Sequence, residues 1–118
     1  MLKKFYVYII ANLNNKKIVT YVGWTNNLIK RLQLHNSGKG AKFTRGRKWI
    51  LIFKKKMPSK KEAMQFEYRL KKNRKKRKVL INKFINTTYI CLNLIYVILS
   101  FFFFKYKSFT KLNKKKKK

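Results

Sequence analysis

The segment from Tyr21 to Arg47 constrains the fold most strongly, because it requires a strand, a turn and a helix in direct succession. Residues 18–22 form a β-branched and aromatic run that is typical of a strand. Thr25 and Asn26 follow it, and both residue types are favoured at helix N-caps. The pattern therefore predicts a helix over residues 27–36 that begins almost directly after the strand.

Two faces of this predicted helix carry different chemistry. Leu28 and Leu32 form an apolar stripe with helical spacing, and Gly38 suits the left-handed conformation that often ends a helix. Arg31 and His35, the only histidine of the chain, are also four residues apart and share a second face. The simplest interpretation of this pair is a surface arginine beside a solvated histidine. A functional interpretation gains support because the preceding strand carries a tyrosine directly into this helix.

Further β-rich runs complete a small sheet. Residues 5–11 and 49–53 favour two more strands, the second of them buried. The asparagine-rich residues 12–17 favour a hairpin between the first two strands. The sequence therefore predicts an α/β fold class, with a small three-stranded, mainly antiparallel sheet flanked by helices and followed by a hydrophobic C-terminal tail.

Ser59 and Glu62 form a capping box that opens a second helix, which we expect to run to about Lys78. Glu62 and Glu67 are the only two acidic residues of the chain. The Glu62 side chain can reach back to the Ser59 amide, whereas Glu67 borders the buried face of this helix. A carboxylate there is costly unless it is paired or bound to a metal. An ion pair with Lys71, one turn later, and a metal-ligand role are the two interpretations of Glu67.

The formal net charge is +31, from 33 basic and 2 acidic residues, and such an excess favours a polyanionic partner. Part of the excess follows from a bias toward residues with AT-rich codons, lysine above all. That bias does not explain the concentration between Arg69 and Lys78, where eight of ten residues are basic. Such a run is either a solvated helix face or a contact to a phosphate backbone, and we favour the contact.

Cysteine content and the N-terminus bear on location. Cys91 is the single cysteine, so no disulfide forms within the chain, and no Cys/His spacing suits zinc. The N-terminal residues lack the apolar run and cleavage site of a signal peptide. These features predict a cytoplasmic protein.

The last third of the chain differs in composition, which predicts a domain over residues 1–82 and a tail over residues 83–118. Residues 84–104 carry no charge, and a run of this length can cross a bilayer as a helix. Lysines flank both ends, so the charge bias orients such a span only weakly. We weigh a C-terminal membrane anchor against an apolar stretch produced by AT-rich drift or a shifted reading frame, without ordered structure. We expect disorder at Lys114–Lys118.

Four short elements, taken in order, resemble the GIY-YIG nuclease superfamily. Tyr6-Val7-Tyr8 stands at the first element of the family, with a tyrosine in place of its glycine, and Tyr21-Val22-Gly23 stands at the second. Residues 35–47 look like those of small stand-alone members of the UvrC/YazA/YhbQ type, and residues 58–67 complete the set. The resemblance covers residues 4–82 and implies the same α/β fold.

This resemblance implies a divalent-metal-dependent endonuclease that hydrolyses phosphodiester bonds of branched or duplex DNA, in repair or recombination. The catalytic residues that it implies are Tyr8, Tyr21, Arg31, His35 and Glu67. Glu67 would bind Mg²⁺ or Mn²⁺, and no small-molecule cofactor is expected. The residue types suit these roles, because the arginine fork binds phosphate oxygens and histidine can carry a proton or bind phosphate. A phenol with a lowered pKa can act as general base, and we favour Tyr21 over Tyr8 for this role.

We expect basic residues around this site to contact the nucleic acid: Lys39, Lys42, Arg45, Arg47, Arg69, Lys71, Lys72 and Arg74. Two alternatives belong to other functional classes. A catalytically weak nucleic-acid-binding module of the same fold would share the charge and the fold. A small membrane protein with a basic cytoplasmic head would depend on the tail alone. The complete set of catalytic residue types favours cleavage over binding.

Overall fold

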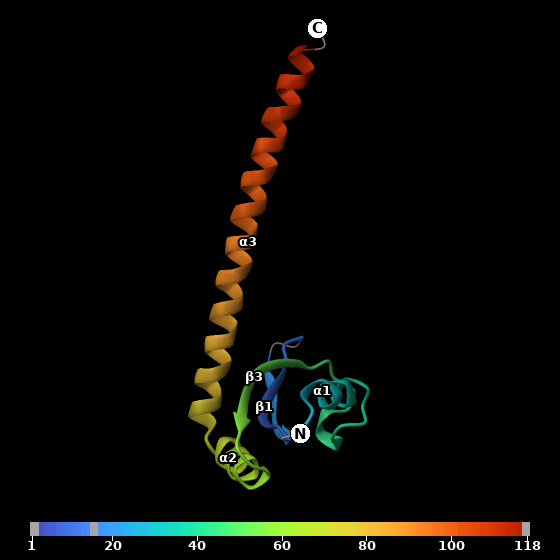
Figure 1. The fold of residues 1–118 in the computed structure, drawn as a ribbon, viewed down its shortest axis with the longest axis vertical. Helices are drawn as coiled ribbons and strands as arrows, with labels where there is room; N and C mark the ends of the chain where they lie inside the picture. Colours follow the sequence, from blue (N-terminus) through green and yellow to red (C-terminus); the bar gives the residue numbers. More distant parts are fainter. Residues whose placement is uncertain (1–2, 15–16, 117–118) are drawn as a thin grey trace. The chain divides into compact units, whose positions relative to one another are not determined.

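A computed structural model describes residues 3–14 and 17–116 of the chain. Its sheet has three strands in the order β2-β1-β3, and both pairings are antiparallel. The strands are β1 (Phe5–Asn12), β2 (Val19–Thr25) and β3 (Ile50–Met57). The helices are α1 (Leu28–Asn36), the short 3-10 helix η1 (Lys42–Thr44), α2 (Lys60–Lys72) and α3 (Arg74–Lys116). The predicted α/β fold, with a small antiparallel sheet, flanking helices and an apolar C-terminal segment, is confirmed (Figure 1).

β1 is the central strand, and its side chains alternate between the two faces of the sheet. Val7 and Ile9 belong to the core on one face, and Tyr8 and Ile10 belong to the core on the other. All four side chains are buried. Residues of α2 pack on the first face and residues of α1 on the second. This burial on both faces explains the almost unbroken apolar run in β1, and it places Tyr8 inside the core on the α1 side.

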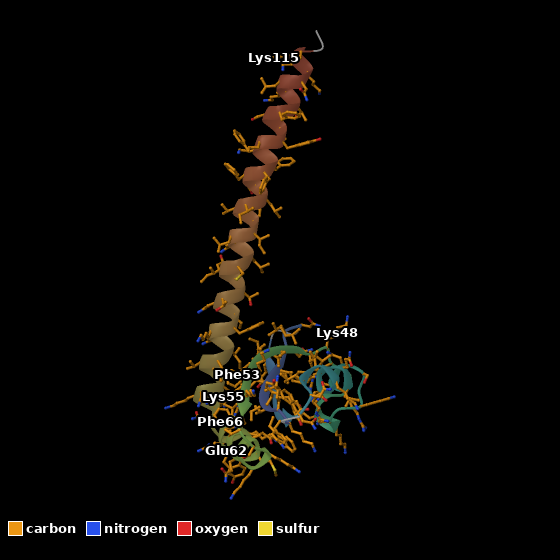
Figure 2. All side chains as sticks on the ribbon, viewed as in Figure 1. Lys48, Phe53, Lys55, Glu62, Phe66 and Lys115 are labelled. Atoms are coloured by element: carbon orange, nitrogen blue, oxygen red, sulfur yellow. The ribbon has the colours of Figure 1, made fainter. Side chains whose placement is uncertain are left out.

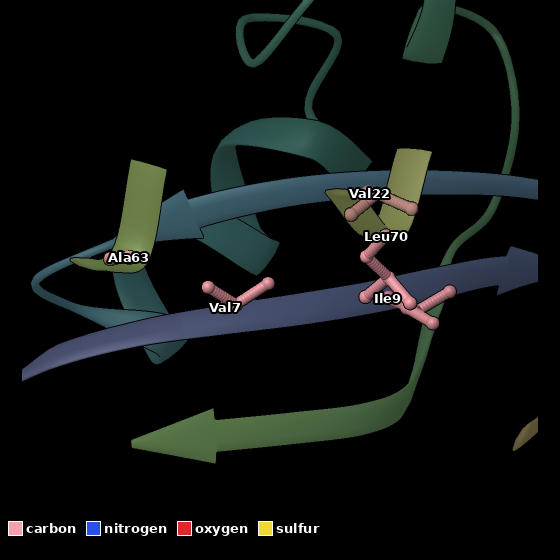
Figure 3. Packing of buried hydrophobic residues seen from close by; sticks show 5 residues of the cluster. All are labelled: Val7, Ile9, Val22, Ala63 and Leu70. Atoms are coloured by element: carbon pink, nitrogen blue, oxygen red, sulfur yellow. The ribbon is translucent and has the colours of Figure 1, made fainter. Parts of the chain in front are cut away.

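α2 covers its face of the sheet through Ala63 and Leu70, which lie two helical turns apart. Figure 3 shows these side chains together with Val7, Ile9 and Val22 of the two neighbouring strands. Helical spacing puts Ala63 and Leu70 on one side of α2, and a spacing of two residues puts Val7 and Ile9 on one face of β1. These two apolar surfaces face each other and form the main apolar contact between helix and sheet.

α1 begins one or two residues later than the N-cap types in the sequence indicated. Asn27 is the N-cap, and its Oδ1 accepts a hydrogen bond from the Lys30 amide at 3.1 Å, so the expectation of Thr25 or Asn26 is wrong. Thr25 supports the cap instead, because its Oγ accepts a hydrogen bond from the Asn27 amide at 3.1 Å. Gly38 follows the helix with φ of 79°, the left-handed conformation that was predicted for it.

α2 begins after Ser59, as predicted, but Glu62 contacts the Ser59 hydroxyl instead of the predicted Ser59 amide, and the helix ends earlier than predicted. The Ser59 Oγ accepts a hydrogen bond from the Glu62 amide at 3.2 Å, and the Ser59 hydroxyl donates to the Glu62 carboxylate at 3.1 Å. The helix stops at Lys72, so the predicted continuation to Lys78 is wrong. Asn73 leaves the helical conformation, with φ of −93° and ψ of 84°, and its Oδ1 accepts a hydrogen bond at 2.9 Å from an amide in the first turn of α3. One asparagine thus ends one helix and begins the next.

β3 differs from the buried strand that was predicted over residues 49–53. It runs from Ile50 to Met57, and its residues are partly or largely exposed because it is an edge strand. The buried side chain of that segment is Trp49, just before the strand. Lys54–Lys56 lie on β3 and are exposed, which is a common protection of an edge strand against pairing with other chains.

The chain forms two compact units, Met1–Phe84 and Ile85–Lys118. The first contains the sheet, α1, α2 and the start of α3, from which Leu80 packs on the α2 side of the core. The second is the remainder of α3, and its large apolar side chains are exposed (Figure 2). Lys114–Lys116 continue this helix, so the disorder predicted for them is wrong. Lys117 and Lys118 lie outside the described residues.

Leu70→Ala should lower the free energy of unfolding by about 2–5 kcal/mol, because it removes buried methyl groups and leaves a cavity under α2. Urea denaturation followed by tryptophan fluorescence measures this change, since Trp24 and Trp49 both lie in the first unit. Ile29→Ala is the matched control, because Ile29 is 75 % exposed on α1 and should change stability by about 0.5 kcal/mol or less. Equal losses in the two variants would contradict the packing of α2.

Candidate active site

Tyr8, Arg31 and His35 meet on the α1 side of the sheet. Tyr8 comes from the middle of β1, and Arg31 and His35 lie one turn apart on α1. The Tyr8 hydroxyl oxygen is 2.7 Å from His35 Nε2, and Arg31 Nε donates a hydrogen bond to the same oxygen at 3.3 Å. Tyr8 is 2 % exposed and His35 is 0 % exposed. The interpretation of His35 as a solvated surface residue is therefore wrong.

Tyr21 and Glu67 lie around this group. Tyr21, on β2, packs on the same side of the sheet as Tyr8, and its ring centroid is 5.0 Å from that of His35. Glu67, on α2, forms an ion pair of 2.5 Å with Lys71, whose Nζ lies 6.0 Å from the Tyr21 ring centroid. The structure thus brings Tyr8, Tyr21, Arg31 and His35 together, and Glu67 is linked to Tyr21 through Lys71.

Two glycines leave the space that these rings occupy. Gly23 pairs with Tyr8 across the two strands, and a Cβ atom on Gly23 would lie 2.4 Å from the Tyr8 hydroxyl oxygen. A Cβ atom on Gly40 would lie 2.5 Å from His35 Nδ1. Any other residue at either position would displace the Tyr8 or His35 ring, so both positions require glycine for steric reasons.

A buried threonine completes the group, and no pattern in the sequence indicated it. The Thr44 Oγ lies 2.9 Å from His35 Nδ1, and Thr44 is fully buried at the end of η1. Trp49 Nε1 donates to the Thr44 carbonyl at 2.8 Å. Asn36 fixes Trp49 in turn, because its Oδ1 accepts from the Trp49 amide at 2.7 Å and its Nδ2 donates to the Trp49 carbonyl at 3.1 Å. Single polar residues in a loop have no periodicity or spacing that would have indicated these contacts.

The electrostatics of the group favour neutral rings beside one permanent charge. Burial raises the pKa of Tyr8 to about 12, against the opposing effect of its hydrogen bond with Arg31. Burial also lowers the pKa of His35 from its ordinary value of 6.5, and the nearby charge of Arg31 lowers it further. The hydrogen bond with Tyr8 raises the pKa of Arg31, which is charged at all ordinary pH values. At neutral pH the phenol and the imidazole are therefore both uncharged, and the guanidinium is cationic.

The donor set restricts the kind of metal that the site can hold. The part of the chain that the structure describes contains no group of three or more His, Cys, Asp or Glu side chains that could bind an ion. Glu67 is the single carboxylate beside the site, and its side chain is 14 % exposed. Mg²⁺ and similar hard cations are often held by one or two carboxylates, with water and substrate phosphate supplying the other oxygens. One carboxylate therefore fits Mg²⁺ or Mn²⁺, and the ion pair with Lys71, the alternative interpretation of Glu67, is also present.

The predicted nucleic-acid contacts form two groups. The first group follows α1 and consists of Lys39, Lys42, Arg45 and Arg47. Its link to the site is Phe43, whose ring stacks on Tyr21 at 6.3 Å between centroids and whose carbonyl accepts a hydrogen bond from Arg47 at 3.1 Å. The second group lies where α2 meets α3 and consists of Arg69, Lys71, Lys72 and Arg74. Apart from Lys71, these residues line one shallow, open concave surface.

The stability of the first unit should be greatest at intermediate pH. Below pH 6.5 the unfolded chain takes up a proton on His35 before the folded chain does, so the free energy of unfolding should fall with falling pH. Above pH 10 the unfolded chain loses the Tyr8 proton before the folded chain does. The free energy of unfolding should therefore fall again as pH rises from about 10 to 12. Denaturant midpoints measured across this range test both slopes. His35→Gln should remove the slope just below pH 6.5, because His35 is the only histidine, and persistence of that slope in the variant would contradict the assignment.

Comparison with known proteins gives one family. The family described as the GIY-YIG catalytic domain matches residues 4–82. A UPF0213 protein of Oceanobacillus iheyensis is 49 % identical over 70 residues, which cover 58 % of this chain and 78 % of that protein. UPF0213 protein YazA of Bacillus subtilis is 51 % identical over 61 residues, which cover 51 % of this chain and 62 % of that one. The solution NMR structure of a UPF0213 protein from Bacillus halodurans is 40 % identical, covers 67 % of this chain and 83 % of that one, and has a TM-score of 0.41. The chain belongs to the GIY-YIG catalytic domain family, which is a family of nuclease type.

Proposed function

We propose that this protein is a divalent-metal-dependent endonuclease that hydrolyses phosphodiester bonds of branched or duplex DNA, in repair or recombination. The observation that carries the proposal is the convergence of Tyr8, Arg31 and His35, with Tyr21 and Glu67 beside them. These side chains supply a cation for the phosphate, phenols for proton transfer and a carboxylate for a metal. No other cluster in the described residues combines these groups.

Arg31 is the residue that we assign to the phosphate. Its Nε donates to Tyr8, which leaves the outer N–H groups of the guanidinium available for the non-bridging oxygens of a phosphodiester. Negative charge grows on these oxygens during attack, so a fixed cation stabilises the transition state more than the ground state.

The two tyrosines have different surroundings, and we assign them different roles. Tyr21 is partly exposed and stands beside Arg31 and Lys71, so it is the phenol that we assign as general base toward water. Tyr8 is buried with a raised pKa, so it holds its proton and serves to position Arg31. Both ring nitrogens of His35 face partners within the protein, and we therefore assign His35 to orient Tyr8 rather than to bind phosphate.

Glu67 is the residue that would hold Mg²⁺ or Mn²⁺, and a metal ion bound there supplies a Lewis acid for the phosphate and the leaving oxygen. Lys71 neutralises Glu67 in the free protein, and its side chain is 50 % exposed. A phosphate backbone offers Lys71 a second anionic partner, so the same lysine can release the carboxylate and contact the nucleic acid.

Glu67→Gln should abolish cleavage and leave DNA affinity nearly unchanged, because it removes the proposed ligand charge and no basic contact. The assay uses flap, junction and duplex DNA with Mg²⁺, Mn²⁺ or EDTA, and EDTA should stop cleavage by the unchanged chain. Glu62→Gln is the matched control: Glu62 lies on the same helix and only caps it, so activity should persist while stability falls by about 0.5–1 kcal/mol. Cleavage by Glu67→Gln at the parent rate would refute the metal-ligand assignment. Binding without cleavage by the unchanged chain, under every metal condition, would favour the catalytically weak binding module.

The basic surface between α2 and α3 should make the salt dependence of DNA binding steep. Replacing Arg69, Lys72, Arg74 and Lys75, which line that surface, with glutamine should reduce the slope of log affinity against log salt by about 3–4, because each duplex phosphate that a basic residue neutralises adds roughly 0.9 to it. Arg77 is left unchanged because it donates a hydrogen bond to the Leu70 carbonyl at 2.8 Å. The control carries the same change of charge at Lys105, Lys107, Lys111 and Lys114. Equal slopes for the two variants would show that the surface is merely solvated.

The composition of α3 supports a second proposed function, which is attachment to a membrane. By length and composition this helix can cross a membrane, and none of the apolar residues in its hydrophobic window is buried. The uncharged run over residues 84–104 is about 31 Å long as a helix, close to the roughly 30 Å of hydrocarbon in a bilayer. We therefore propose that residues 1–82 form the cytoplasmic nuclease domain and that residues 84–104 of α3 anchor it to the membrane.

The full chain should float with lipid vesicles in a density gradient. Ile95→Lys combined with Ile98→Lys should release it, because each lysine near the centre of a span costs about 2.5–3.5 kcal/mol. Ser108→Lys combined with Asn113→Lys adds the same charge outside the apolar run and should still float. If both variants float equally, the charge of the chain rather than its apolar helix binds the lipid. A chain cut after Asn82 should remain soluble and cleave DNA, and loss of its cooperative unfolding would contradict the domain boundary.

A further inference from the structure

The Thr44 hydroxyl has three hydrogen-bond partners. It accepts from the Ala41 amide at 3.2 Å, donates to the Ala41 carbonyl at 3.0 Å and lies 2.9 Å from His35 Nδ1. A hydroxyl has one proton and two acceptor lone pairs. The Ala41 carbonyl also accepts from the Thr44 amide at 3.1 Å, so it keeps a partner wherever the hydroxyl proton points. When the proton points at that carbonyl, the hydroxyl oxygen accepts from both nitrogens. In this arrangement His35 Nδ1 carries a proton, and the contacts of Tyr8 at the other side of the ring select it.

The tautomer of His35 then sets the direction of every bond beyond it. A neutral imidazole with a proton on Nδ1 has a bare Nε2, which accepts a hydrogen bond from the Tyr8 hydroxyl at 2.7 Å. The Tyr8 oxygen, having directed its proton toward His35, presents a lone pair to Arg31 Nε at 3.3 Å. The chain of donors runs from Arg31 to Tyr8, and from Tyr8 through His35 to Thr44.

The opposite tautomer would break this chain at Tyr8. A proton on His35 Nε2 would point at the Tyr8 oxygen, where Arg31 already donates, and the Tyr8 proton would need a further acceptor in a buried place. At the other end, Thr44 would turn its proton toward Nδ1, and the Ala41 carbonyl would keep its hydrogen bond from the Thr44 amide. Only one direction satisfies all of these groups.

We propose that Thr44 is a positioning residue, whose hydroxyl holds His35 in the Nδ1-protonated tautomer and thereby directs the hydrogen-bond chain that holds Arg31 for the phosphate. The role of Arg31 in this statement rests on the proposed function. The tautomer does not, because it follows from the hydrogen bonds that Tyr8 and Thr44 make with His35.

The surroundings of Thr44 are rigid enough for such a role. Its carbonyl accepts a hydrogen bond from Trp49 Nε1 at 2.8 Å, and Trp49 is 3 % exposed. Gly40 passes so close to the imidazole that a Cβ atom there would touch His35 Nδ1 and Cα. The ring and the hydroxyl therefore have little freedom to exchange partners.

Because His35 is the only histidine, nitrogen NMR of the full chain in detergent micelles, labelled with ¹⁵N in the histidine ring, reads this one tautomer directly. The spectrum is taken at a pH where the imidazole is neutral. We expect the unchanged chain to show mainly the form with a proton on Nδ1. Thr44→Val keeps the shape of the side chain and removes the acceptor, so the Nε2-protonated form should gain population. Thr44→Ser keeps the hydroxyl and should restore the original spectrum.

Thr25→Val is the matched control. Thr25 is also a nearly buried threonine, 8 % exposed, and its hydroxyl bonds only within the turn before α1. Its tautomer spectrum should not change, even if stability falls. On DNA, Thr44→Val should lower kcat on the order of 10–100-fold with little change in KM, since a small misplacement of Arg31 affects the reacting centre more than the affinity. Thr44→Ser should recover most of that decrease.

The outcomes separate this inference from the proposed function. An Nε2-protonated His35 in the unchanged chain, or a spectrum that Thr44→Val leaves unaltered, would overturn the role of Thr44 whether or not the protein cuts DNA. Should Thr44→Val fail to fold, the unchanged chain and Thr44→Ser still decide the tautomer. The expected tautomer in a chain without nuclease activity would refute the proposed function and leave the hydrogen-bond chain intact. The expected tautomer with normal kcat in Thr44→Val would refute the positioning of Arg31.

Discussion

The hydrogen bond between Tyr8 and His35 ties the central strand to α1, and the whole candidate site depends on it. Both side chains are buried, so each polar atom needs a partner inside the protein. Arg31 and Thr44 supply these partners, and Gly23 leaves the space for the Tyr8 ring and hydroxyl. The site is therefore part of the core on this face of the sheet. A change that loosens the core here also misplaces the guanidinium, so stability and the proposed chemistry are linked.

The elements that sequence reasoning found are those with local patterns. The stripe on α1, the spacing of Arg31 and His35 and the cap of α2 each depend on residues within one or two turns. What it missed depends on contacts across the chain. His35 is buried because it meets a tyrosine 27 residues away and a threonine 9 residues away. The end of α2 at Asn73 was also not predicted, because a strongly basic sequence has the same composition whether it forms one helix or two.

The scarcity of acidic residues gives Glu67 its importance. In a chain with a net charge of +31, few basic residues can form an ion pair with a carboxylate, and Lys71 forms one with Glu67. Their ion pair is half-exposed and i to i+4, a geometry worth only about 0.3–0.5 kcal/mol in typical helices. So weak a pair can be exchanged at little cost when phosphate groups arrive, each offering a charge for Lys71. The same carboxylate can thus stabilise α2 in the free protein and, under the proposed function, serve a metal in the complex.

The two units use the same kinds of apolar residue with opposite results. In β1 the valine and isoleucine side chains are covered on both faces, so the hydrophobic effect stabilises the sheet. Beyond Phe84 the leucine, isoleucine and phenylalanine side chains of α3 are exposed, while the helix satisfies its own backbone hydrogen bonds. A helix of this kind needs no partner to form in lipid, whereas water penalises its entire surface. Among the described residues, the core of the first unit extends along α3 as far as Leu80. Under the proposed function, an anchor that begins beyond Leu80 can therefore be joined to this fold without altering its core.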